Sequence, residues 1–415
     1  MLQHDAPHNF QDNQIQELLV ENTALLQNTL TLIPSENYAS AAVRAPLSSL
    51  LSSKYAEGYP GKRYYPGCQI ADSIETLAID RCKKLFGAEH ANVQPHSGTQ
   101  ANMAALFAIL KPGESILGMD LKAGGHLSHG TKISFSGTFY HSYTYGVNPE
   151  THLLDYDNIE ELAQKLRPKV IIAGASAYPR TIDFARFAQI AKSVNAFLIA
   201  DIAHIAGLVA AELHSSPIPH ADIITFSTHK TLRGPRGGGI LCTAPLQEKI
   251  DRAVMPGIQG GPCVNSIAAK AVAFNEALQP EFYLYQRQVI ANSQALAHAL
   301  QTLGYTLISG GTDNHLLIID LRNKNITGLE AEKALESVGI FANRNCIPAD
   351  PQKPSIASGL RLGTPAVTTR GMKDAEMELL AQLIHETLEN KNNQTQLTAI
   401  AEKIAQLAQR FPIAP

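Results

Sequence analysis

The feature that most constrains the fold is a series of short apolar segments that alternate with helical patterns between residues 75 and 275. Apolar runs at 115–119, 169–173, 197–200 and 222–226 have the length of buried strands. Strands of this kind, separated by helices, are typical of a mostly parallel sheet that helices cover on both faces. The sequence therefore predicts an α/β fold.

The chain of 415 residues is long enough for more than one folded unit. We expect an N-terminal helical arm over residues 1–30 and a large domain over 31–279. Strand and helix patterns are mixed over 280–415, which predicts a smaller α+β domain at the C-terminal end.

Composition narrows the class of protein. The net charge is −3 and no basic block is present, so we expect no nucleic-acid partner. No run of 18 apolar residues and no signal-peptide pattern occurs, so neither a membrane association nor secretion is expected. The five cysteines show no CxxC spacing, which favours reduced thiols in a cytoplasmic protein.

The most informative segment for function contains Lys230. An apolar strand (Ile223, Ile224) leads into hydroxyl side chains, His229 and Lys230, and then a basic, glycine-rich turn. A lysine in such a place can form a Schiff base if its surroundings lower its pKa. Pyridoxal phosphate is the cofactor that this type of lysine most often holds, and it requires a carboxylate against its pyridine nitrogen.

Asp201 is the candidate for that carboxylate. It ends another apolar strand, one strand-and-helix step before Lys230. A strand-end aspartate alone is more often a cap or turn residue, but its pairing with a strand-end lysine favours the functional interpretation.

Two further segments fit the same cofactor. Ser97, Gly98 and Thr99 open a predicted helix, where backbone N–H groups can bind a phosphate, although a plain N-cap by a hydroxyl is the simpler interpretation. His126 lies on a glycine-rich turn and could stack on a planar ring. The spacing of His126 and His129 would also allow a metal, but no acidic or cysteine partner lies nearby, so we expect none.

Arg361 lies between small residues in the C-terminal part of the chain. An isolated arginine there usually forms a surface ion pair, yet its planar fork also suits the α-carboxylate of an amino acid.

Longer motifs extend over most of the chain. They are Leu32-Ile-Pro-Ser-Glu-Asn37, Lys54-Tyr-Ala-Glu-Gly-Tyr-Pro-Gly-Lys-Arg-Tyr-Tyr65, Gln94-Pro-His-Ser-Gly98, Gly124-Gly-His-Leu127, Asp201-Ile-Ala-His-Ile-Ala-Gly-Leu208, Thr228-His-Lys-Thr-Leu-Arg-Gly-Pro-Arg236, Pro256-Gly-Ile-Gln-Gly-Gly261 and Gly311-Thr-Asp-Asn-His315. With these motifs the chain resembles the serine hydroxymethyltransferase family from about residue 28 to 390.

The resemblance implies a fold-type I pyridoxal phosphate enzyme, similar to aspartate aminotransferase, with a mostly parallel seven-stranded sheet in the large domain. It implies the reversible conversion of serine and tetrahydrofolate into glycine and 5,10-methylenetetrahydrofolate. An alternative on the same scaffold is a folate-independent or altered-specificity 3-hydroxy amino acid aldolase or hydroxymethyltransferase. A binding protein without turnover is a third interpretation, which the intact cofactor residues disfavour.

The resemblance also implies roles for individual residues. Lys230 would bind the cofactor covalently, Asp201 would pair with the pyridine nitrogen and His126 would stack on the ring. The other cofactor contacts that it implies are Ser97, Gly98, Thr99, Ser176, His204, His229, Gly260 and Gly261.

Substrate contacts follow from the same comparison. Ser35 and Arg361 would bind the amino-acid carboxylate, and Glu57 of the other subunit would move the proton of the serine hydroxyl, which implies a homodimer with shared active sites. Tyr55, Tyr65 and Thr228 complete the implied catalytic set. The implied folate contacts are Glu57, Tyr64, Leu121, Gly125, Leu127 and Asn345.

The chain departs from the family pattern in a few places. They are the segment 66–71, Phe226 with Ser227 before the lysine, Cys263-Val264-Asn265, and Lys353-Pro354-Ser355 where the family carries an aromatic in a folate-contacting loop. Loss of an aromatic contact would weaken folate binding by roughly 1–3 kcal/mol. The sequence therefore leaves open how strongly the chain depends on folate.

Overall fold

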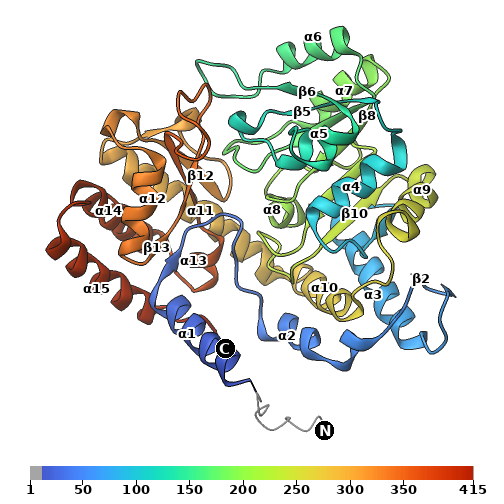
Figure 1. Cartoon of the computed structure of the whole chain (residues 1–415), viewed down its shortest axis with the longest axis horizontal. Helices are drawn as coiled ribbons and strands as arrows, with labels where there is room; N and C mark the ends of the chain where they lie inside the picture. Colours follow the sequence, from blue (N-terminus) through green and yellow to red (C-terminus); the bar gives the residue numbers. More distant parts are fainter. Residues whose placement is uncertain (1–11, 415) are drawn as a thin grey trace.

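The computed structural model describes residues 12–414, and its centre is a seven-stranded sheet (Figure 1). Strands β5, β6, β7, β8 and β9 run parallel to one another, whereas β10 is antiparallel to both β4 and β9. In spatial order the strands are β4 (His90–Asn92), β10 (Gly238–Cys242), β9 (Ile223–Ser227), β8 (Phe197–Asp201), β7 (Val170–Gly174), β5 (Ser115–Met119) and β6 (His141–Tyr145).

This sheet confirms the predicted α/β fold and the implied seven strands. Strand patterns did not predict β4, β6 or β10, for physical reasons. Strand β4 has only three residues, β6 is an edge strand with largely exposed polar side chains, and β10 begins with two glycines. None of them carries the long apolar run of a central parallel strand.

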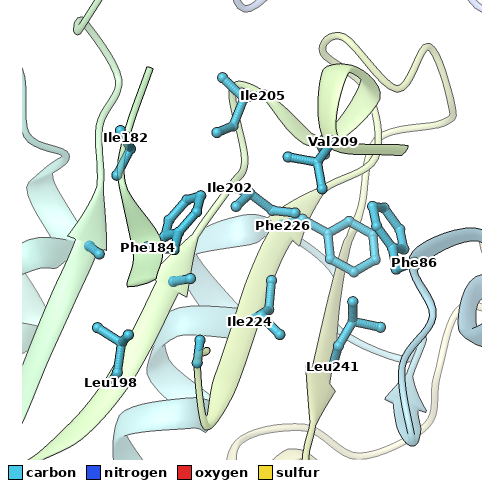
Figure 2. Close-up of a cluster of buried hydrophobic side chains, with 14 of the residues drawn as sticks. Phe86, Ile182, Phe184, Leu198, Ile202, Ile205, Val209, Ile224, Phe226 and Leu241 are labelled. Atoms are coloured by element: carbon cyan, nitrogen blue, oxygen red, sulfur yellow. The ribbon is translucent and has the colours of Figure 1, made fainter. Parts of the chain in front are cut away.

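Helices cover both faces of the sheet, because alternate residues of each central strand point to opposite faces. Leu198, Ile224 and Phe226 pack on one face, where the ring of Phe226 lies 5.1 Å from that of Phe86 (Figure 2). Ile199 and Ile223 are each one position away from Leu198 and Ile224 in the same strands, and they pack on the other face.

Five helices supply the first face: α3 (Gln69–Phe86), α6 (Tyr156–Leu166), α7 (Phe184–Ser193), α8 (Ala206–Ala210) and α10 (Val264–Ala277). The second face is covered mainly by α4 (Gly98–Ile109) and α9 (Gln247–Arg252). Short elements also occur between residues 41 and 139: α2 (Ala41–Arg44), β2 (Gly58–Tyr59), β3 (Lys62–Arg63) and α5 (Phe135–Phe139).

A second core lies in the C-terminal part of the chain, beyond α11 (Pro280–Thr302). Its antiparallel sheet has the order β11 (Thr306–Leu307), β12 (Leu316–Asp320), β15 (Gly359–Gly363) and β14 (Asn343–Asn345). The helices of this part are α12 (Gly328–Ser337), α13 (Pro365–Thr369), α14 (Asp374–Glu389) and α15 (Gln394–Arg410). Two separate cores fit the expected division near residues 279 and 280, which stays a prediction.

The N-terminal arm joins this second part rather than the large sheet. Helix α1 (Asn13–Asn28) packs beside α15, and β1 (Leu30–Thr31) pairs in parallel with β13 (Ile340–Phe341) (Figure 1). Arg370 fixes this junction by donating hydrogen bonds of 2.6 Å each to the carbonyls of Thr29 and Ala408. Residues 1–11 of the expected arm lie outside the described part of the chain.

Within residues 12–414, the longest helices are too polar to serve as membrane spans.

Candidate active site

A cavity of about 390 Å³ opens at the carboxyl ends of β7, β8 and β9, where ligands bind in open α/β sheets. Its volume suits a small organic cofactor. The sequence separates its lining residues by as many as 326 positions, from Ser35 to Arg361. The fold nevertheless brings most of the predicted set together: Ser35, Ser97, Gly98, Thr99, His126, Ser176, Asp201, His204, His229, Lys230 and Arg361.

Lys230 lies three residues after the end of β9 and points into this cavity. Burial lowers its pKa to about 8, with the positive charges of Arg361 and Arg236 adding to the effect and the Asp201 carboxylate opposing it. A lysine with this pKa has a useful fraction of free amine near neutral pH, as Schiff-base formation requires.

Asp201, the last residue of β8, is held by three donors. Its Oδ2 atom accepts hydrogen bonds of 2.8 Å from His129 Nε2 and from Asn102 Nδ2, and its Oδ1 accepts one of 3.0 Å from the Ala203 N–H. Burial alone would raise the pKa of this carboxyl, but the hydrogen bonds from His129 and Asn102 hold it far below its usual range. Asp201 is therefore a fixed negative charge at one end of the cavity.

His129 and Asn102 were not predicted to act on Asp201. Both are almost fully buried, and the His129 ring contacts the carboxylate from 72 positions away in the chain. The His126–His129 spacing was the only signal for His129, and it did not indicate a contact with a carboxylate.

His126 lies on the wall of the cavity, and its Nδ1 is 2.7 Å from the Ser128 hydroxyl. Burial lowers the pKa of His126 to about 4, against the attraction of Asp201. The ring is therefore neutral near pH 7 and presents a flat apolar surface to a planar ligand.

The N-terminus of α4 forms another wall. The Ser97 hydroxyl caps the helix by accepting a 3.1 Å hydrogen bond from the Gln100 N–H, and Gly98 and Thr99 line the cavity beside it. The simple capping interpretation is thus correct, and the unpaired N–H groups of the first turn still favour an anion such as a phosphate.

The loop before α4 is fixed by Lys270, another residue that the sequence did not single out. Its ammonium group is fully buried and donates to the carbonyls of Val93 (2.7 Å), Pro95 (2.9 Å) and Gly238 (2.9 Å). Gly238 is required at this point, because a β-carbon there would lie 2.4 Å from the Ser97 carbonyl oxygen.

Arg361 enters the cavity from β15 of the C-terminal sheet. Its Nη1 donates 2.6 Å to the Ser176 carbonyl, and its Nε and Nη2 lie 3.3 and 3.2 Å from Asn343 Oδ1. Burial lowers its pKa to about 10, so it remains a cation at neutral pH. Asn343, which the sequence gave no reason to select, orients this guanidinium group.

Three residues near Lys230 were predicted to belong to the site, and two of them line the cavity. His204 and His229 line the cavity. Thr228 does not: it is completely buried, and its hydroxyl donates to the Pro235 carbonyl at 2.5 Å. Thr228 therefore supports the glycine-rich turn that follows Lys230, and its place in the catalytic set stays a prediction.

The family comparison bears directly on this geometry. A family model described as serine hydroxymethyltransferase matches residues 9–384. The chain belongs to the serine hydroxymethyltransferase family. It is accordingly a fold-type I, pyridoxal phosphate-dependent transferase. The donor set fits that cofactor, since one cavity offers a lysine amine, a buried carboxylate and a helix N-terminus.

The expected cross-subunit residues of this serine hydroxymethyltransferase family member form a separate cluster. Glu57 Oε1 lies 3.4 Å from the Tyr55 hydroxyl and next to Gly260, and the Tyr55 ring packs beside Gly261. The rings of Tyr55 and Tyr65 are 4.9 Å apart. Among the described residues, none of these five lines the cavity around Lys230 of the same chain.

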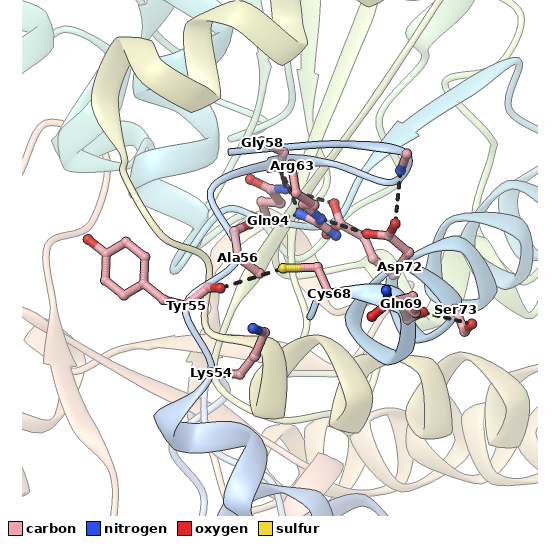
Figure 3. Close-up of polar contacts among 12 residues, drawn as sticks. Lys54, Tyr55, Ala56, Gly58, Arg63, Cys68, Gln69, Asp72, Ser73 and Gln94 are labelled. Carbon is pink, nitrogen blue, oxygen red and sulfur yellow. Dashed lines mark hydrogen bonds and ion pairs between the residues drawn. The ribbon is translucent and has the colours of Figure 1, made fainter. Parts of the chain in front are cut away.

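A buried polar network fixes the turn that carries Glu57 (Figure 3). Arg63 donates to Asp72 Oδ1 at 2.8 Å and to Glu75 Oε2 at 2.6 Å. The same guanidinium group donates to the carbonyls of Ala56 and Gly58, which flank Glu57, at 2.9 and 2.8 Å. The turn is therefore held from both sides.

The divergent segment 66–71 lies next to this network. Cys68 is buried, with its thiol 3.7 Å from the Tyr55 carbonyl, and α3 begins at the following residue (Figure 3). The thiol of Cys68 thus contacts the backbone of Tyr55.

None of the expected folate residues lines the cavity around Lys230 in the described part of the chain, and their role stays a prediction. Leu121 and Leu127 are largely exposed on the loops that flank His126, and Gly125 allows the close chain approach there, since a β-carbon would meet the Met119 carbonyl at 2.0 Å. Asn345 ends β14, and its amide donates to the Cys346 carbonyl at 2.6 Å. Tyr64 is exposed beside Tyr65. The divergent loop 353–355 is exposed as well.

Proposed function

We propose that this protein interconverts serine and tetrahydrofolate with glycine and 5,10-methylenetetrahydrofolate, with pyridoxal phosphate bound covalently to Lys230. The observation that carries the proposal is that Lys230, the Asp201 carboxylate and the N-terminus of α4 line the same cavity. The reaction belongs to the serine, glycine and one-carbon metabolism of the family. The five free cysteines fit a reducing compartment, and we propose a cytoplasmic location.

The bound cofactor would supply an electron sink for the α-carbon of the amino acid. Asp201 would keep the pyridine nitrogen protonated, because its own low pKa keeps it ionised. His126, neutral and flat, would stack on the ring, and Gly98 with Thr99 would bind the phosphate.

Arg361 and Ser35 would bind the substrate carboxylate. The Nε and Nη2 atoms of Arg361 make only long hydrogen bonds to Asn343 Oδ1, so these two donors can bind a carboxylate while Nη1 stays bonded to the Ser176 carbonyl. Ser176 and His204 would contact the phenolic oxygen of the cofactor, and His229 would line the ring beside Lys230.

The separate cluster of Tyr55, Glu57 and Tyr65 with the Gly260-Gly261 turn supports a homodimer. In the proposed dimer each cluster would complete the cavity of the partner subunit, and Glu57 would take or give the proton of the serine hydroxyl. Leu121, Gly125, Leu127, Asn345 and Tyr64 would contact tetrahydrofolate.

A second candidate is a folate-independent aldolase for 3-hydroxy amino acids on the same scaffold. The exposed loop 353–355, which offers lysine, proline and serine in place of an aromatic, favours it. The cofactor residues would keep the same roles.

One experiment separates the two functions. The visible absorbance that develops when glycine is added to the holoenzyme is recorded with and without tetrahydrofolate. A large rise with tetrahydrofolate supports the proposed transferase. A glycine response that tetrahydrofolate does not change supports the aldolase, and no response to glycine would refute both.

A further inference from the structure

Two buried histidines form a direct pair where the two parts of the chain meet. His204 Nδ1 lies 3.2 Å from His315 Nε2, and the rings are stacked, with centroids 5.5 Å apart and an angle of 28° between their planes. His204 follows β8 of the large sheet, whereas His315 immediately precedes β12 of the C-terminal sheet. His204 also lines the cavity around Lys230.

Both rings are neutral. Burial, with the positive charges of Lys230 and Arg361, lowers the pKa of His315 to about 3 and that of His204 well below its usual value. The titratable groups whose charges lower the pKa of His204 further are Lys230, Arg361, His315 and His126. A neutral imidazole carries one N–H, so in this pair one ring donates and the other accepts.

The surroundings of His315 indicate which ring donates. Its second nitrogen, Nδ1, is buried and has no hydrogen-bond partner among the described residues. A buried N–H without an acceptor is rarer in proteins than an acceptor without a donor. The proton of His315 is therefore best placed on Nε2, where His204 Nδ1 accepts it.

We propose that His315 is a positioning residue that fixes His204 in the form with its proton on Nε2, so that His204 donates into the cavity. This inference rests on the proposed function, because the acceptor of the hydrogen bond from His204 is the phenolic oxygen of bound pyridoxal phosphate. His315 itself does not touch the cofactor.

Hydrogen bonds and an ion pair hold His315 and the two residues before it in place. Its carbonyl accepts a 3.0 Å hydrogen bond from the Thr364 N–H. The preceding Asn314 donates 3.0 Å to the Tyr178 carbonyl of the large domain, and Asp313 pairs with Arg180 at 2.7 Å. The segment thus bridges the two parts of the chain.

The pair also connects the cofactor end of the cavity to the substrate end. Strand β12, which starts after His315, pairs with β15, where Ile318 is the register partner of Arg361. The residue that orients His204 and the residue proposed to bind the carboxylate therefore belong to the same small sheet.

The test uses the near-ultraviolet to visible absorbance ratio of the bound cofactor, which reports whether the phenolic oxygen is protonated. His315→Leu removes the donor, and we expect the ratio at a fixed neutral pH to rise by up to about tenfold, the worth of one hydrogen bond. His315→Gln keeps an N–H at similar reach and should preserve the ratio. His385→Leu, which removes another C-terminal histidine that contacts the Tyr305 hydroxyl at 3.2 Å, is the matched control and should also preserve it.

Cofactor content and far-ultraviolet circular dichroism are measured for each variant. If His315→Leu does not fold, His315→Asn replaces it, since its shorter amide cannot reach His204 and the same rise is expected. An unchanged ratio in a cofactor-loaded His315→Leu or His315→Asn protein would overturn the inference, as would an equal rise in His315→Gln. Failure of the wild-type protein to bind pyridoxal phosphate would instead overturn the proposed function.

Discussion

His129 Nε2 lies 2.8 Å from Asp201 Oδ2, so a buried imidazole from the loop after β5 orients the carboxylate at the end of β8. The two residues are 72 positions apart in the chain and both are nearly inaccessible to solvent. The carboxylate that would keep the cofactor nitrogen protonated thus depends on a side chain that does not line the cavity.

Removal of that support should slow catalysis without removing the cofactor. In His129→Leu the Asp201 carboxylate loses a donor, its pKa rises and its hold on the pyridine nitrogen weakens. One hydrogen bond to a charged group is worth about 1.5–3 kcal/mol, so we expect kcat to fall by about one to two orders of magnitude. Steady-state kinetics at saturating cofactor measure this. His129→Gln keeps a hydrogen-bond donor, so its kcat should lie between those of the wild type and His129→Leu. A wild-type kcat in His129→Leu would contradict the proposed support of Asp201 by His129.

Arg361→Ala should weaken amino-acid binding while the cofactor stays bound. Loss of a charged fork from a closed site costs about 2–5 kcal/mol, which predicts a rise in the dissociation constants of serine and glycine of at least thirtyfold or so. Spectral titration with each amino acid measures the constants, and the cofactor absorbance before titration is the control. Serine affinity equal to that of the wild type would place the carboxylate elsewhere.

The buried imidazoles should make the cofactor-free protein sensitive to acid. Burial lowers the pKa of His126 to about 4 from its ordinary 6.5, so between these pH values the unfolded chain binds a proton that the folded chain does not. The free energy of unfolding therefore falls as the pH drops through this range, by about 3 kcal/mol for this group.

Urea denaturation at a series of pH values measures this dependence. His126→Asn should lose about that much less stability between pH 6.5 and 4 than the wild type, because the titrating group is gone. Parallel curves for the two proteins would show that His126 titrates normally.

The Glu57 cluster predicts complementation between subunits. A Glu57→Gln chain mixed with a Lys230→Ala chain should form dimers in which one site has both residues intact, because the two residues of a site come from different chains. Mixed dimers isolated by paired affinity tags should therefore regain activity, up to about half that of the wild type per dimer, since one of the two sites is complete. If both parents are inactive and verified mixed dimers are too, the shared-site arrangement is wrong.

The sequence predicted the central strands well because each is a continuous apolar run that packs on both faces. Strand β8 was expected at 197–200 and occupies Phe197–Asp201, and β9 was expected at 222–226 and occupies Ile223–Ser227. Strand β10 was missed because its pairing with β9 depends on glycines that let the chain approach Ser97, a tertiary requirement that leaves no periodic pattern.

The residues of the candidate site likewise divide into those that the sequence could indicate and those that it could not. Lys230, Asp201 and Arg361 could be selected because each is a charged group in an apolar or glycine-rich setting. His129, Asn343 and His315 could not, since each acts by contacting another polar side chain that only the fold brings within reach. The sequence also gave no sign that the Thr228 hydroxyl donates to the Pro235 carbonyl in the turn that follows it.

The most direct test of the account is the chemical location of the cofactor. The holoenzyme is reduced with borohydride, digested and mapped by mass spectrometry, with Lys230→Ala treated in parallel. The account predicts a pyridoxyl group on the peptide that contains Lys230, about one per chain, and none in Lys230→Ala. A pyridoxyl group on another lysine, or equal labelling of the Lys230→Ala protein, would contradict it.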